Sequence, residues 1–564
     1  MSPREDAVLS TMQDVPLLIS RILTHGSTIH GTSQVTTWRE EPGEPQRRTF
    51  AEIGARAAQL AHALRDELAV TGDDRVATFM WNNSDHVEAY FAIPSMGAVL
   101  HTLNVRLPAD QLTWIVGHAA DRVVIVNGSL IPLFAPLLPH LTTVEHVVVS
   151  GPGDRAPLTD AAAVGVVRVH EYEDLIAGRP TTYDWPELDE RQAAAMCYTS
   201  GTTGDPKGVV YSHRSIYLHS MQVNMAQSMG LTDQDTSLIV VPQFHVNAWG
   251  LPHATFMTGV NMLMPDRFLQ PGPLAGMIER ERPTHAAAVP TIWQCLLPEL
   301  TDRPRDVSSL TQVTIGGSAC PPALMDAFDR LGMRVFHAWG MTETSPLGTV
   351  ARPPARVIGT PEEFAYRLTQ GRFPAGVEAR LSGPDGERLP WNGVSAGELE
   401  VRGPWIAGAY YNGPEAQPLR PADKFSADGW LKTGDVGTIS PDGYLTLTDR
   451  AKDVIKSGGE WISSVELENA LMAHPDVTEA AVVAVPDDKW GERPLAAVVL
   501  KEGADADFAA LRTFLADHGR IAKWQLPERW TVIDAVPKTS VGKFDKKVLR
   551  ARYADGDLTV TTLP

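Results

Sequence analysis

The sequence predicts an α/β protein with a large N-terminal part, in which helices cover parallel-rich sheets, then a β-rich subdomain and a small C-terminal α/β domain. Three observations support this prediction. The chain has 564 residues, more than one hydrophobic core usually organises. Helix and strand patterns alternate over the first long segment, a rhythm typical of parallel sheets covered by helices. After about residue 390 the composition becomes glycine-rich and strand-like.

The first helices are predicted from their caps and periodicity. Thr49 and Glu52 have the spacing of a capping box. Apolar residues then recur at helical spacing over residues 50–68, which predicts an amphipathic helix. Ser84 or Asp85 is expected to cap the next helix.

Short β-branched runs predict the strands. Two glycine-rich stretches, 393–413 and 429–450, predict a series of short strands with a "PDG" turn. The motif "DRAKD" at 449–453 marks the expected boundary of the small C-terminal domain. The clearest single strands are "RVATFM" (75–80), "RVVIVNG" (122–128), "VEHVVVSG" (144–151), "EAAVVAVPDD" (479–488) and "PLAAVVL" (494–500).

Composition argues against several classes of protein. The net charge of −19 is a poor match to nucleic acid, so no nucleic-acid partner is expected. The three cysteines, Cys197, Cys295 and Cys320, cannot all pair with one another, which favours a reducing compartment. Neither a signal peptide nor an apolar run long enough to span a membrane is expected, so we predict a cytoplasmic protein.

The stretch "YTSGTTGDPKG" (198–208) has the composition of a ligand-binding loop. Its glycines let main-chain amides turn toward a ligand, its hydroxyl groups donate hydrogen bonds, and Lys207 adds a positive charge. A loop of this kind after a strand suits oxygen-rich anions. It lacks the register of a Walker loop. A mobile surface turn is the alternative that the loop alone leaves open.

Four further motifs follow in order, and with the loop they resemble the adenylate-forming superfamily of acyl-CoA synthetases, peptide-synthetase adenylation domains and beetle luciferases. The closest resemblance is to fatty acyl-CoA synthetases, through "PQFHVNAWGLP", "KSGGEWISS" and "TSVGKFDKK". The four motifs are "HAWGMTET" (337–344), "KTGD" (432–435), "DRAKDVIKSGGEWIS" (449–463) and "PKTSVGKFDKK" (537–547).

The resemblance implies a nucleotide site. The glycine loop would hold the β- and γ-phosphates, Asp435 would accept from the ribose hydroxyls with Arg450 reinforcing it, and Glu343 with Thr199 would bind Mg²⁺. Read alone, Glu343 could be a helix N-terminal acid, Asp435 a turn residue and Arg450 half of a surface salt bridge. The implied ATP- and AMP-binding set is Thr199, Ser200, Gly201, Thr202, Thr203, Gly204, Lys207, Gly316, Gly317, Ser318, His337, Trp339, Gly340, Met341, Thr342, Asp435, Arg450 and Lys543.

Two residues depart from the family pattern. Trp339 stands where relatives usually have Tyr, and its flat apolar face should still stack on adenine. Asp205 places a negative charge at the tip of the phosphate loop, which could weaken ATP binding slightly. The segment "GGSAC" (316–320) does not predict a hydrolase. The nucleophile-elbow pattern G-x-S-x-G requires glycine at the position of Cys320.

The resemblance also implies an acyl site and a moving domain. His245 and Trp249 are expected on one helical turn, with Trp249 gating the fatty-acid tunnel and His245 near the carboxylate; an aromatic core helix is the alternative. The catalytic set is Lys543, Glu343, Lys207 and His245. Lys452 would be the turning point between an AMP-binding domain (1–449), a hinge (450–452) and a mobile domain (453–564). After the turn Lys456, Gly458, Gly459 and Trp461 would line the CoA channel.

The implied reaction is the ATP-dependent joining of a medium- to long-chain fatty acid to CoA, by way of an acyl-adenylate. The alternatives are a CoA ligase for another apolar acid, such as a sterol side chain or aryl acid, and an acyl-AMP ligase that loads a carrier protein. The implied substrates and cofactors are a fatty acid, ATP, CoA and Mg²⁺. A peripheral membrane contact and a homodimer stay open.

Overall fold

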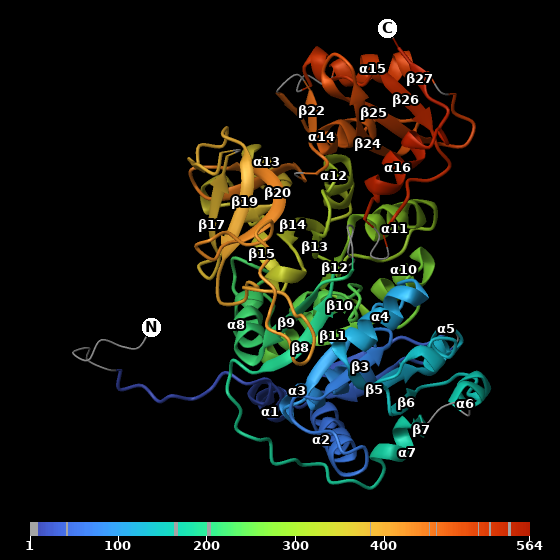
Figure 1. Ribbon diagram of the computed structural model, residues 1–564, viewed down its shortest axis with the longest axis vertical. Coiled ribbons are helices and arrows are strands. Elements are labelled where there is room, and N and C mark those ends of the chain that lie inside the picture. Colours follow the sequence, from blue (N-terminus) through green and yellow to red (C-terminus); the bar gives the residue numbers. More distant parts are fainter. Residues whose placement is uncertain are drawn as a thin grey trace.

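The computed structural model describes residues 10–40, 43–162, 167–199, 205–383, 385–450, 452–457, 460–505, 507–517, 521–539 and 543–563, with the main chain alone described at 460 and 461. These residues form three sheets with helices packed on them (Figure 1). The C-terminal residues make the upper lobe in Figure 1, above the two larger sheets. This is the predicted α/β class, with a large sheet-rich N-terminal part and a small C-terminal domain.

The first sheet has seven strands in the order β7-β6-β5-β3-β4-β8-β9. All neighbours are parallel except β8 and β9, which form an antiparallel pair on either side of the glycine loop. The strands are β3 (Arg75–Phe79), β4 (Val99–Thr102), β5 (Asp121–Asn127), β6 (His146–Ser150), β7 (Arg168–Glu171), β8 (Ala193–Tyr198) and β9 (Gly208–Ser212).

The second sheet has 14 strands and changes character along its width. Its parallel half runs β14-β13-β12-β10-β11-β1. Its antiparallel half begins at Leu347, earlier than the β-rich region expected after residue 390, and includes the strands of that region. The strands are β1 (Gln34–Thr37), β2 (Gln46–Thr49), β10 (Thr236–Ile239), β11 (Asn261–Met264), β12 (His285–Ala288), β13 (Gln312–Gly316), β14 (Arg334–Gly340), β15 (Leu347–Val350), β16 (Gly371–Arg372), β17 (Glu378–Ser382), β18 (Arg388–Leu389), β19 (Gly397–Arg402), β20 (Leu431–Ile439) and β21 (Tyr444–Arg450).

The third sheet lies entirely after the "DRAKD" motif. A long antiparallel pair, β24 and β25, forms its centre and matches the two buried runs predicted there. The strands are β22 (Ile455–Ser457), β23 (Glu460–Ile462), β24 (Val477–Asp487), β25 (Gly491–Leu500), β26 (Arg529–Val532) and β27 (Thr561–Thr562).

Helices cover these sheets. The main ones in the N-terminal part are α1 (Ile19–Ile29), α2 (Phe50–Asp66), α3 (Ser84–Ser95), α4 (Ala109–Ala119), α5 (Ile131–Phe134), α6 (Ala156–Ala162), α7 (Tyr172–Ile176), α8 (His213–Asn224), α9 (Leu251–Thr258), α10 (Pro271–Glu281), α11 (Pro290–Asp302), α12 (Pro322–Arg330) and α13 (Glu362–Leu368). The C-terminal part adds α14 (Ser464–Leu471), α15 (Phe508–Asp517) and α16 (Lys546–Ala554).

The caps at two helix starts test the sequence predictions. The capping box at α2 is confirmed, with Thr49 and Glu52 bonding each other's main-chain N–H. The predicted cap of α3 is wrong by one or two residues, because Asn83 accepts from the N–H of His86. The Asp85 carboxylate is instead bound by Arg48 and by the hydroxyl of a β6 serine.

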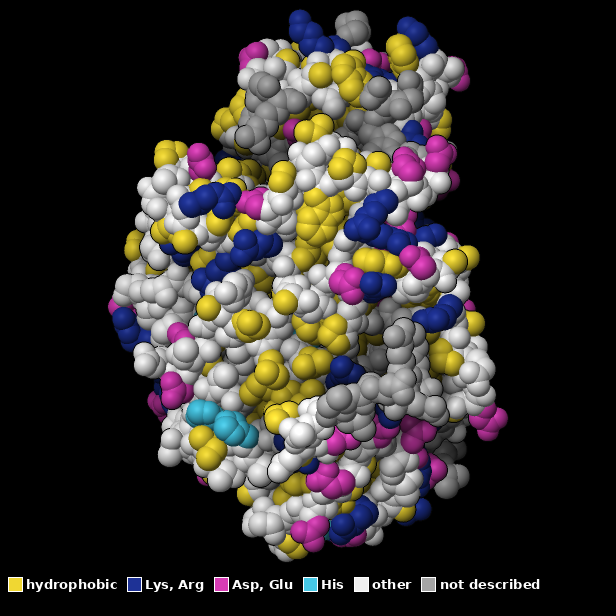
Figure 2. Space-filling model, turned by 90° about the vertical axis from the view of Figure 1, so that its left-hand side faces the viewer, with side chains coloured by type: hydrophobic (Ala, Val, Ile, Leu, Met, Phe, Trp, Pro, Cys, Tyr) yellow, Lys and Arg dark blue, Asp and Glu magenta, His cyan; other side chains and the backbone are white. Residues whose placement is uncertain are grey.

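Charged side chains of both signs are interspersed over the face shown in Figure 2, with hydrophobic groups between them. Within the described part of the chain, no helix combines the length and apolar character that crossing a membrane requires.

Candidate active site

A cavity of about 450 Å³ lies where the carboxyl ends of β13 and β14 meet β20, β21 and the start of the C-terminal domain. It collects most of the residues implied by the motifs, although they span more than 300 positions in the sequence. The predicted residues that line it are Thr199, Lys207, His245, Trp249, Gly316, Gly317, Ser318, His337, Trp339, Gly340, Met341, Thr342, Glu343, Asp435, Arg450, Lys452 and Lys543.

The remaining predicted residues lie elsewhere or outside the described residues. Lys456 is exposed on β22 and is not part of the cavity lining. Only the main chain of Trp461 is described, within β23. Ser200, Gly201, Thr202, Thr203, Gly204, Gly458 and Gly459 fall outside the described residues.

The two ends of the glycine loop are held together. Thr199 donates its N–H to the carbonyl of Lys207 at 2.9 Å, and its Oγ1 accepts from the N–H of Lys207 at 3.2 Å. The N–H of Tyr411 donates to the carbonyl of Gly208 at 2.8 Å, so a second segment braces the far end of the loop. Both described ends of the loop therefore have fixed positions beside the cavity.

Tyr410 connects the loop lysine to Glu343. Its hydroxyl donates to Glu343 Oε1 at 2.6 Å, and the Lys207 ammonium lies 5.1 Å from the centre of its ring, within cation–π range. Burial, chiefly, and the Glu343 carboxylate raise the pKa of Tyr410, so the hydroxyl stays protonated and donates. Sequence reasoning missed Tyr410, because an aromatic pair in a glycine-rich stretch carries no spacing signal.

Glu343 lies at the cavity and in the first turn of a very short 3-10 helix. It lies in the three-residue 3-10 turn η4 (Thr342–Thr344), which is too short to present a helix dipole, and its side chain is buried against the cavity. No group of three or more His, Cys, Asp or Glu that could hold a metal occurs among the described residues. One carboxylate and one hydroxyl suit Mg²⁺, which is usually held by few protein ligands and the substrate's phosphates.

Asp435 and Arg450 face each other across β20 and β21. Arg450 Nε lies 3.2 Å from Asp435 Oδ1, and the indole N–H of Trp339 donates to Asp435 Oδ2 at 2.7 Å. Asp435 is buried on a strand, so the alternative of a turn residue is wrong. Arg450 forms the ion pair that the other alternative expected, with its side chain 46% exposed, and it also lines the cavity. Trp339 thus fixes the orientation of the Asp435 carboxylate; its stacking on adenine stays a prediction.

Lys543 enters the cavity from the C-terminal domain. The N–H of Thr539 donates to the Lys543 carbonyl at 2.7 Å. The Lys543 side chain lies beside the main chain of Gly317, where a Cβ would be 3.6 Å from Lys543 Cε; the φ of +88° at Gly317 is the feature that favours glycine there. Burial lowers the pKa of Lys543 to about 8, and Arg450 adds to this, while Asp435 and Glu343 oppose it.

The segment with His245 and Trp249 differs from its prediction. The expected right-handed helical turn is wrong, because Val246, Asn247, Ala248 and Trp249 all have φ between 42° and 57°. A left-handed turn costs roughly 1–2 kcal/mol per non-glycine residue, so packing must hold it.

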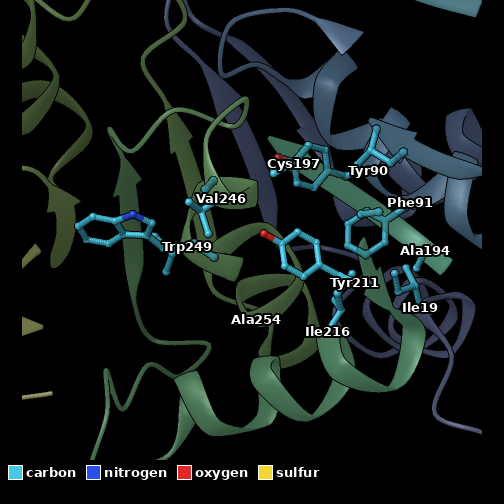
Figure 3. Packing of buried hydrophobic residues seen from close by; sticks show 14 of the residues in the cluster. Ile19, Tyr90, Phe91, Ala194, Cys197, Tyr211, Ile216, Val246, Trp249 and Ala254 are labelled. Atoms are coloured by element: carbon cyan, nitrogen blue, oxygen red, sulfur yellow. The ribbon is translucent and has the colours of Figure 1, made fainter. Parts of the chain in front are cut away.

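Buried bonds hold that left-handed turn. Asn247 Oδ1 accepts from the Cys197 thiol at 2.9 Å and from the Thr102 hydroxyl at 3.4 Å. Burial raises the pKa of the Cys197 thiol, so the thiol stays protonated and donates this bond. Figure 3 shows the outcome: Trp249 points away from the rings of Tyr90, Phe91 and Tyr211, with Val246 between them.

His245, Val246 and Trp249 of this segment line the cavity. The Trp249 ring lies against the main chain of Gly316, where a Cβ would come within 3.1 Å of Trp249 Cη2. Burial lowers the pKa of His245 to about 3, with smaller contributions from Lys543 and Arg106, so the imidazole is neutral. The alternative of an aromatic core helix is wrong, because this segment does not form a right-handed helix.

The fold matches solved structures of adenylate-forming enzymes. A crystal structure of an anthranilate CoA ligase with anthranoyl-AMP superposes with a TM-score of 0.83 at 24% identity, covering 97% of this chain and all of that one. The ATP-bound MatB of Rhodopseudomonas palustris superposes with a TM-score of 0.78 at 25% identity, covering 96% of this chain and 99% of that one.

Sequence comparison gives the family. The "AMP-binding enzyme" family model matches residues 30–411, and the "AMP-binding enzyme C-terminal domain" model matches residues 466–543. The chain is 44% identical to a 3-methylmercaptopropionyl-CoA ligase of Ruegeria pomeroyi, over 97% of this chain and 99% of that one. It is 40% identical to a medium-chain-fatty-acid–CoA ligase of Ectopseudomonas oleovorans (97% and 98%) and to a long-chain-fatty-acid–CoA ligase of Thermus thermophilus (98% of each). The chain therefore belongs to the AMP-binding enzyme family, as an acid–thiol ligase of the AMP-forming type.

Proposed function

We propose that the protein is an ATP-dependent fatty acyl-CoA ligase that works in two steps. The carboxylate of the acid attacks the α-phosphate of ATP, which forms an acyl-adenylate and releases pyrophosphate. The thiol of CoA then attacks the acyl carbonyl, which forms the thioester and releases AMP. The observation that carries the proposal is that Lys543, from the C-terminal domain, shares one cavity with Asp435, Arg450 and Glu343.

The charges in the cavity suit the first step. Two anions, a carboxylate and a phosphate, must approach each other, and a fixed cation that meets the developing charge lowers that barrier. Lys543 would be this cation, and Lys207 would bind the outer phosphates; both line the cavity. Asp435, held by Trp339 and Arg450, has its carboxylate fixed in the cavity to accept the ribose hydroxyls. Neutral His245 would lie beside the acid without repelling Lys543.

Mg²⁺ would be held by Glu343 and Thr199 together with the phosphates of ATP. When bound, it would supply positive charge to the phosphate oxygens. Tyr410 keeps one oxygen of Glu343 in place by its hydrogen bond, which leaves the other oxygen for the ion.

The second step would use a different orientation of the C-terminal domain. We propose an AMP-binding domain over residues 1–449, a hinge at 450–452 around Lys452, and a mobile domain over 453–564. In the present orientation Lys543 is inside the cavity and Lys456 outside it. After rotation, Lys456, Gly458, Gly459 and Trp461 would face the acyl-adenylate and line the CoA channel.

The acid is proposed to be a medium- to long-chain fatty acid, because two relatives at 40% identity over nearly the full chain carry those names. A short thioether acid is the second candidate, since a relative at 44% identity is a 3-methylmercaptopropionyl-CoA ligase.

A pyrophosphate-release screen tests this function. Acids from C4 to C18, 3-methylmercaptopropionate, a sterol side-chain acid and an aryl acid are each supplied with ATP and Mg²⁺, with and without CoA. We expect release with fatty acids and thioester formation only with CoA. Release with no acid in the series would contradict the proposal. Thioester formation on a carrier protein but not on CoA would favour the carrier-loading alternative.

The location and assembly are also proposals. A cytoplasmic location is supported by the cysteines, since Cys197, Cys295 and Cys320 are all free thiols. A homodimer would be tested by sedimentation of the purified protein, and peripheral membrane contact by co-sedimentation with vesicles.

A further inference from the structure

A buried group of hydrogen bonds joins the end of β21 to the C-terminal domain. Asp449 Oδ2 accepts from the N–H of Ser464 at 2.7 Å and also from the Ser464 hydroxyl. Ser464 is the first residue of α14 and is fully buried, and Asp449 is 5% exposed. Asp449 therefore binds the start of a helix that lies on the other side of the hinge.

The same serine continues the connection to the active-site lysine. The Lys546 ammonium donates to Ser464 Oγ at 2.5 Å and lies 2.8 Å from Glu468 Oε1. Lys546 begins α16 and follows Lys543 by three residues, in a segment fixed by the N–H of Asp545, which donates to the Pro537 carbonyl. The position of Lys543 is thus tied to Asp449 through Ser464 and Lys546.

The two halves of this group belong to different bodies of the protein. Asp449 pairs with Val436 between β21 and β20, inside the 14-stranded sheet. Ser464, Glu468 and Lys546 are all held in the C-terminal domain. A rotation about the hinge would carry Ser464 away from Asp449, so these bonds exist in only one orientation. Contacts made in one of two states are what shift the equilibrium between them.

We propose that Asp449 is a positioning residue for adenylation: its bonds to Ser464 hold the C-terminal domain in the orientation that keeps Lys543 in the nucleotide cavity. This inference rests on the proposed two-step function. Both carboxylate oxygens are already engaged, because Oδ1 accepts from the N–H of Arg450 at 2.8 Å. Asp449 also lines the nucleotide cavity, but both of its oxygens are bound by groups of the protein, so we assign its role to the domain that it holds.

Asp449→Asn tests the proposal with the full-length enzyme. The two half-reactions are measured separately: pyrophosphate release without CoA, and thioester formation from supplied acyl-AMP and CoA. Replacing a charged acceptor with a neutral one should lower the ratio of the first rate to the second by about tenfold. The control is Asp487→Asn, whose carboxylate bonds Arg529 and two N–H groups within the C-terminal domain alone, and which should leave the ratio unchanged.

Two further measurements separate positioning from general damage. Ser464→Ala keeps the N–H that Asp449 accepts but removes the hydroxyl link to Lys546, so it should shift the ratio in the same direction. On a Lys543→Ala background, Asp449→Asn should lower adenylation no further, because Asp449 acts through Lys543.

Each result has a distinct meaning. Equal losses in both half-reactions, or full additivity with Lys543→Ala, would overturn the role of Asp449. If Asp449→Asn does not fold, Ser464→Ala decides: an unchanged ratio of adenylation to thioester formation in that variant would also overturn the role of Asp449. A wild-type enzyme that forms no acyl-adenylate would instead overturn the proposed function.

Discussion

At the scale of single residues, Lys543 shows how one environment sets both the chemistry and its pH range. Burial lowers its pKa to about 8, from about 10.4 for a lysine in water. The cavity therefore disfavours the charged form of Lys543. Docking of the C-terminal domain becomes more favourable as pH rises from about 8 to about 10.4. The lysine that docks at high pH is neutral, however, and a neutral lysine cannot stabilise the negative charge that develops during adenylation.

Adenylation is therefore expected to lose rate as pH rises through about 8. The alkaline limb should appear in kcat/KM for ATP, which reports the free enzyme, and should move to higher pH in kcat, because bound phosphates favour the charged lysine. The charges that act on Lys543 are those of Arg450, Asp435 and Glu343, and Lys543 in turn acts on His245, whose imidazole is neutral. A profile of kcat/KM that stays flat to pH 9.5 would be incompatible with this environment.

Tyr410 and Tyr411 offer a matched pair for the metal site. Tyr410→Phe removes the hydrogen bond to Glu343, and loss of a group that orients a metal ligand typically costs 10–100-fold in metal affinity or activity. The Mg²⁺ concentration for half-maximal adenylation should rise accordingly. Tyr411→Phe is the control, because its buried hydroxyl has no hydrogen-bond partner among the described residues. The same Mg²⁺ dependence in both variants would remove Tyr410 from the site.

At the scale of elements, the left-handed turn at residues 246–250 directs Trp249 into the cavity. Trp249→Ala is expected to relax discrimination between acids of different length and to leave the KM for ATP nearly unchanged. Trp293 is the comparison, because it is fully buried in a different core and its loss should cost roughly 3–5 kcal/mol of stability. Trp249→Ala that behaved like Trp293→Ala, with equal losses for all acids, would make Trp249 a core residue only.

The connection between β21 and β22 is the second element with a testable role. Lys452→Pro fixes φ and removes a main-chain donor where the domain is proposed to turn. Because the present orientation already places Lys543 in the cavity, thioester formation from supplied acyl-AMP should suffer more than adenylation. Comparable effects on both half-reactions would contradict a hinge at this position.

At the scale of the whole molecule, the sequence predicted the features that depend on short local patterns and missed those that depend on contacts between distant segments. The capping box at Thr49, the strands and the C-terminal α/β domain follow from short patterns, and the structure has them. The cavity-lining residues came from motifs that lie far apart in the chain. Tyr410 and Asp449 were missed because their roles arise from contacts between distant segments.

The left-handed turn marks the other limit of sequence reasoning. Its spacing suits a right-handed helix, and only the buried bonds of Asn247 to Cys197 and Thr102 explain why the main chain takes the opposite hand. Local propensity gives way to tertiary packing at such sites, and this one lies beside the proposed acyl pocket.

The central claim is that one domain serves two half-reactions with different faces, and the two half-reaction rates of Lys543→Ala test it most directly. Losing this preorganised cation should slow adenylation by at least about 10²-fold. Thioester formation from supplied acyl-AMP and CoA should stay near the wild-type rate, because Lys543 has then left the cavity. Adenylation above about a tenth of the wild-type rate, or an equal fall in both half-reactions, would contradict the account.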